Sequence, residues 1–100
     1  MQASLSSTGE GCFKVVGALD RHTVGALLRE GEHSLPAAGA VAVDLSGVGQ
    51  VDSAGVALLL EWARLADRRG LQLTYRHVPE RALALARIGN AEWLLPRGEG

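Results

Sequence analysis

Residues 41–60 read V-A-V-D-L-S-G-V-G-Q-V-D-S-A-G-V-A-L-L-L, and this stretch decides the fold. The apolar run over residues 40–45 predicts a buried strand, and a glycine-containing loop then leads into a hydrophobic helix. The loop brings Asp52 and Ser53 to the first turn of that helix, where free backbone N–H groups and the helix dipole favour an acceptor or an anion. This position suits a plain N-cap, a phosphorylation site or a docking point, and the residues alone leave the three open.

Outward from this stretch, strands and helices alternate without a linker, and no repeat or low-complexity tract interrupts them. We expect a β-β-α-β-α-β-α order, with strands at Leu5 and over residues 13–19, 40–45 and 71–75, and helices from Thr23, over 53–69 and over 80–88. Gly31, Pro36 and Gly39 are expected to end the first helix, and Gly70 and Gly89 the other two. The β-α-β connections imply parallel pairing of the last three strands.

Apolar side chains within these elements predict the core. The apolar run over residues 40–45, broken only near its end by Asp44, suits a central strand covered on both faces. In the following helix, Leu58, Trp62 and Leu65 share one face and are expected to pack on the sheet. Trp93 is expected to seal the end of the sheet.

Composition limits the classes of function. The 100 residues carry a formal net charge of −1, which argues against a nucleic-acid binder that works through a basic surface. The single cysteine, Cys12, fits a reducing compartment and is interpreted as a small core residue. No secretory signal or membrane-spanning run is present, so we expect a cytoplasmic protein without direct membrane insertion.

The search for catalytic and cofactor-binding motifs is negative. Residues 47–52 resemble the start of a dinucleotide fingerprint, but Asp52 would repel a pyrophosphate. There is no Walker A motif and no G-x-S-x-G elbow around Ser53. Metal-ligand spacing is missing among the three histidines, His22, His33 and His77. We therefore expect no enzyme activity, no cofactor and no metal.

Two motifs resemble the STAS domain family of anti-sigma factor antagonists: V-D-L-S-G-V-G-Q-V-D-S-A-G within residues 41–55, and G-A-L-D-R-H-T at residues 17–23. The resemblance implies one STAS domain over residues 1–100, with a small mixed four-stranded sheet, helices mainly on one face, and a role in protein docking. In sigma-regulating members the position of Ser53 is the regulatory phosphosite. The site implied for docking or phosphorylation consists of Ser53, Asp52, Ala54 and Gly55, supported by Asp20 and Asp44. Ala54 departs from those members, which often carry a second serine there.

The C-terminal half is similar to one subgroup, the MlaB-like STAS domains. The similarity is carried by A-L-L-L-E-W-A-R-L-A-D-R-R-G, by V-P-E-R-A-L-A-L-A-R-I-G-N and by L-L-P-R at residues 94–97. It implies a cytoplasmic subunit bound to the MlaF-like ATPase of the Mla ABC complex, at the inner face of the inner membrane. That complex transports phospholipid and maintains outer-membrane asymmetry. The alternative is an anti-sigma factor antagonist whose partner is an anti-sigma factor kinase and whose switch is phosphorylation of Ser53.

Overall fold

The computed structural model describes residues 3–98 and has the expected element order. The elements are β1 (Ala3–Gly9), β2 (Cys12–Leu19), α1 (Val24–Ser34), β3 (Gly39–Val51), α2 (Ser53–Arg69), β4 (Leu71–Arg76), α3 (Glu80–Ile88) and a 3-10 turn, η1 (Glu92–Leu94). Residues 1, 2, 99 and 100, which the expected domain also spans, lie outside this range.

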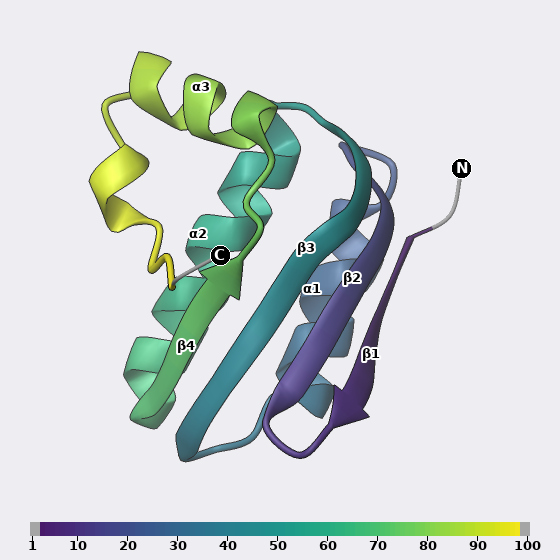
Figure 1. Cartoon of the computed structure of the whole chain (residues 1–100), viewed down its shortest axis with the longest axis vertical. Helices are drawn as coiled ribbons and strands as arrows, with labels where there is room; N and C mark the ends of the chain where they lie inside the picture. The colour runs from purple at the N-terminus through teal and green to yellow at the C-terminus, as the bar shows by residue number, and fades with distance from the viewer. Residues whose placement is uncertain (1–2, 99–100) are drawn as a thin grey trace.

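The four strands form one mixed sheet in the order β1-β2-β3-β4. β1 and β2 are antiparallel, whereas β2, β3 and β4 run parallel to one another. Figure 1 shows α1 and α2 packed on one face of the sheet and α3 lying across the end where the parallel strands finish. The expected mixed four-stranded sheet with helices mainly on one face is confirmed.

The core lies between the sheet and its helices. Leu58, Trp62 and Leu65 of α2 are buried, which confirms the predicted register of this helix. Tyr75 of β4 is fully buried, and its hydroxyl donates a hydrogen bond of 2.7 Å to the carbonyl of Leu59. Burial raises the pKa of the Tyr75 phenol well above its ordinary value, so the hydroxyl stays protonated and tethers β4 to α2.

The prediction that β3 is covered on both faces is wrong. Val41, Val43 and Leu45 are buried against the helices, but Ala42 and Asp44 point to the other face and are partly exposed. No described helix packs on that face, which carries mainly small and polar side chains. The small alanines make the run look apolar although only every second side chain enters the core.

Cys12 lies on the same open face and is exposed, so its assignment to the core is wrong. It pairs with Ala42 in the sheet, and the next residue, Phe13, is the one that points inward. The period-two alternation of a strand therefore separates two neighbouring apolar residues onto opposite faces.

Two predicted boundaries also differ from the structure. β3 continues through residues 46–51, which were expected to form a loop, because they keep pairing with β2 across two register shifts. α1 continues through Gly31, the first of the three residues expected to end it, and stops at Ser34, just before Pro36. Gly31 is buried where the ring of Trp62 crosses the helix. The glycine is required for close packing and does not end the helix.

Trp93 does not seal the sheet, contrary to expectation. It is 75% exposed, and its indole donates a hydrogen bond of 3.1 Å to the carbonyl of Asn90. Leu95 is buried instead, and the chain after it pairs with β4 through Tyr75 N–H to Pro96 O at 2.7 Å. The edge of β4 is thus covered by backbone and not by an indole ring.

Candidate functional site

The start of α2 is capped by Asp52 and not by Ser53. Asp52 has extended backbone angles, and its Oδ1 accepts a hydrogen bond of 3.1 Å from the N–H of Gly55. Ser53 is the first residue of the helix, and its side chain is exposed. Within residues 3–98 its hydroxyl forms no hydrogen bond, so it is available to an external group.

The backbone beneath Ser53 is fixed against the end of β2. The N–H of Asp52 donates to the carbonyl of Leu19 at 3.1 Å. Gly55 packs on the same residue, where an added Cβ would overlap the Leu19 carbonyl oxygen and lie 2.7 Å from the Leu19 Cβ. Ala54, between them, is partly buried. The first turn of α2 is therefore held in place before any partner arrives.

Asp20 shapes the neighbouring loop between β2 and α1. Its Oδ1 accepts a hydrogen bond of 2.8 Å from the N–H of His22, and its carbonyl accepts from the N–H groups of Thr23 and Val24. The buried hydroxyl of Thr23 donates to the carbonyl of Ala18 at 2.7 Å and closes the turn. Asp20 thus organises this loop, while Thr23 occupies the N-cap position of α1.

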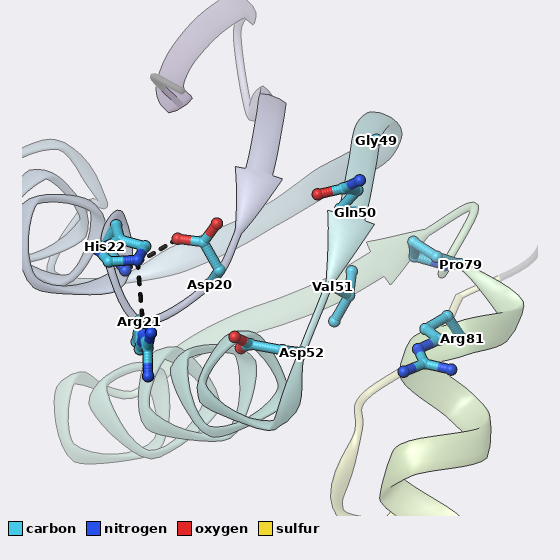
Figure 2. A pocket seen from close by; sticks show the side chains of 9 residues that line it. All are labelled: Asp20, Arg21, His22, Gly49, Gln50, Val51, Asp52, Pro79 and Arg81. Atoms are coloured by element: carbon cyan, nitrogen blue, oxygen red, sulfur yellow. Dashed lines mark hydrogen bonds between the residues drawn. The ribbon is translucent and has the colours of Figure 1, made fainter.

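These two loops meet the start of α3 around an open pocket of ≈ 630 Å³ (Figure 2). The pocket lies at the carboxyl ends of the parallel strands, where ligand and partner sites of α/β sheets commonly form. Its walls are three segments of the chain: Asp20, Arg21 and His22; Gly49, Gln50, Val51 and Asp52; Pro79 and Arg81. Ser53 directly follows the second segment.

Sequence reasoning identified Asp20, Asp52 and Ser53 but missed the basic side chains of this pocket, Arg21 and Arg81. A usable signal was present, because both follow the carboxyl end of a strand, and parallel strands end at one edge of the sheet. Together with Asp20 and Asp52 they line the pocket with side chains of both charges.

Asp44 lies apart from this pocket, on the open face of the sheet. Its Oδ1 lies 3.0 Å from the Nδ1 of His77 and accepts a hydrogen bond of 2.8 Å from the N–H of Ser46. The Ser46 backbone hydrogen bond, aided by His77, lowers the pKa of the Asp44 carboxyl to about 2. The structure therefore brings Asp52, Ser53, Ala54, Gly55 and Asp20 together, but not Asp44.

Two further features bear on what this site can do. In the described range, 3–98, no group of three or more His, Cys, Asp or Glu side chains is placed to hold a metal ion. No helix in the same range has the length and apolar character needed to cross a membrane. The site offers a positioned hydroxyl, two carboxylates and two guanidinium groups, which are groups suited to recognition.

Comparison with known proteins gives one assignment. No curated protein matches the chain. A family model described as "Mlab, STAS domain" matches residues 4–96, nearly the whole chain. The chain therefore belongs to the STAS domain family, in its MlaB branch.

Proposed function

We propose that this chain, as a single STAS domain over residues 1–100, is a cytoplasmic subunit that binds the ATPase of a Mla-type phospholipid-transport ABC complex and stabilises or regulates it. STAS domains are in general binding domains that act through protein–protein contacts. The observation that carries the proposal is the exposed Ser53 hydroxyl on a fixed helix start beside an open pocket.

The fixed backbone at the start of α2 supports docking through Ser53. Because Asp52 caps α2 and is bonded to Leu19, Ser53 is presented on a backbone that does not need to reorganise. Preorganised contact groups lose less conformational entropy on binding. We call the end of the molecule formed by the pocket and Ser53 the docking end.

A second function is supported by the same hydroxyl. An anti-sigma factor antagonist would be switched by phosphorylation of Ser53, and this side chain is exposed at a helix N-terminus, where a phosphate is stabilised. Incubation with an anti-sigma factor kinase and ATP tests this alternative. Transfer of phosphate to Ser53 that is lost in the Ser53→Ala variant would favour the anti-sigma factor antagonist over the transport complex.

Co-expression with the ATPase subunit tests the first proposal. The two proteins are expected to co-elute, and the melting temperature of the ATPase should rise, because a ligand that binds only the native state stabilises it. Separate elution with an unchanged melting temperature and unchanged ATPase activity would refute the proposal.

Ser53→Glu is expected to leave the isolated domain folded but to weaken ATPase binding by about tenfold or more. The carboxylate is tolerated by the dipole of α2, yet it places an unpaired charge next to Asp52 within the docking end. Gln72→Glu is a matched control, since it adds the same charge at an exposed position near the start of β4, at the opposite end of the sheet. Equal affinity of both variants would exclude Ser53 from the interface.

A further inference from the structure

We propose that the pocket of the docking end receives a carboxylate-bearing segment of the partner protein, bound by the guanidinium groups of Arg81 and Arg21. This inference rests on the proposed function, because it specifies the chemistry of the same docking end. If this is correct, the partner segment that enters the pocket between the starts of α2 and α3 carries an acidic side chain.

Arg81 presents its guanidinium group at the α3 side of the pocket. It stands in the first turn of α3, is exposed and lines the pocket. Its neighbour Glu80 does not neutralise it, since the Glu80 carboxylate lies 3.9 Å from Arg87, which also holds Glu92 at 3.0 Å. Among the ion pairs within residues 3–98, none includes Arg81.

The two carboxylates that line the pocket each accept a hydrogen bond from a nearby backbone N–H. Asp52 Oδ1 is bound to the N–H of Gly55, and Asp20 Oδ1 to the N–H of His22. Figure 2 shows both carboxylates on one side of the pocket, with Arg81 on the α3 wall opposite them. Arg81 therefore lies across the pocket from both carboxylates, and its guanidinium group is open to a carboxylate that enters along the α3 wall.

Arg21 supplies a second guanidinium group, on the same side of the pocket as Asp20 and Asp52. Its Nε donates to the Nε2 of His22 at 3.5 Å, and no ion pair within residues 3–98 includes it. The terminal nitrogens of the guanidinium group remain available for a bidentate contact, which is the geometry that carboxylates prefer. An open pocket of ≈ 630 Å³ admits an acidic side chain together with part of its backbone.

The test measures affinity for the ATPase subunit with charge-reversed variants of the full chain. Arg81→Glu and Arg21→Glu are each expected to lower the affinity by about tenfold or more, and Arg81→Lys by less, because lysine keeps the charge but loses the fork. Arg68→Glu, an exposed position in the last turn of α2, is the matched control and should change the affinity by less than about twofold. Melting curves of each isolated variant verify folding.

The outcomes separate this inference from the proposed function. If the wild-type chain does not bind the ATPase, the proposed function fails. If the wild type binds the ATPase, and the Arg81→Glu and Arg68→Glu variants bind it with equal affinity, the proposed function stands and the acidic contact is refuted. Restoration of Arg81→Glu binding by an acidic-to-arginine change on the ATPase would establish the pair. Millimolar inorganic phosphate that binds the isolated domain, and is lost in Arg81→Glu, would show a phosphate site and overturn the inference.

Discussion

Replacing Trp62 with alanine is expected to lower the free energy of unfolding by about 3–5 kcal/mol, the range for large aromatic-to-alanine changes in a core. Trp62 is fully buried in α2 and crosses α1 at Gly31. Truncation of the indole ring leaves a cavity between α1 and α2, the two helices that cover the sheet. Because a domain of this size has only about 5–15 kcal/mol of stability in total, urea denaturation followed by circular dichroism should show a large shift of the midpoint.

The indole nitrogen makes the Trp62→Phe variant a sensitive comparison. Trp62 Nε1 is buried and has no hydrogen-bond partner among residues 3–98. The burial of this unpaired N–H costs free energy, which reduces the net stabilisation from packing the indole ring. Trp62→Phe removes this group and keeps most of the apolar surface, so it should cost much less than Trp62→Ala. Trp93→Ala, at a 75% exposed position, should stay within about 0.5 kcal/mol of the wild type. Similar losses for Trp62→Phe and Trp62→Ala would contradict this picture.

Gly31 and Trp62 together show what the sequence predicts and what it cannot. The helical spacing of Leu58, Trp62 and Leu65 predicts a buried face of α2, and all three are buried. The sequence also predicts that Gly31, with Pro36 and Gly39, ends α1, because glycine weakens a helix interior. The contact that favours glycine comes from a residue 31 positions later in the chain, so no local pattern around Gly31 contains it.

The same limit applies to the docking end. Asp52, at the start of α2, could be identified because strand, cap and helix follow one another in the chain. Arg21 and Arg81 are 60 positions apart in the sequence and become neighbours of one pocket only through the order of the parallel strands. A sequence motif can mark the helix start, but the charges that surround it depend on the topology.

Gly55→Ala is expected to destabilise the protein although alanine is the better helix former. An added Cβ would overlap the carbonyl oxygen of Leu19, and it would lie 2.7 Å from the Leu19 Cβ and 3.0 Å from its carbonyl carbon. Backbone atoms cannot rotate away as a flexible side chain can, so α2 must shift from the end of β2. Overpacking of this kind costs about 1–3 kcal/mol or more, against a helix-propensity gain of up to about 1 kcal/mol. We expect a net loss, measured as a lower melting temperature.

Gly25→Ala provides the matched control, because Gly25 also lies in the first turn of a helix, α1, but is exposed. Its added Cβ would meet nothing closer than the Nη1 of Arg29 at 3.8 Å. This variant should therefore gain about 0.5–1 kcal/mol from helix propensity alone. The two glycine-to-alanine changes thus have opposite expected signs. Gly55→Ala should also weaken ATPase binding, since the shift moves Asp52 and Ser53, whereas Gly25→Ala should leave it unchanged. If both variants melt above the wild type, the start of α2 is not pressed against Leu19, and Ser53 is not presented on a fixed backbone.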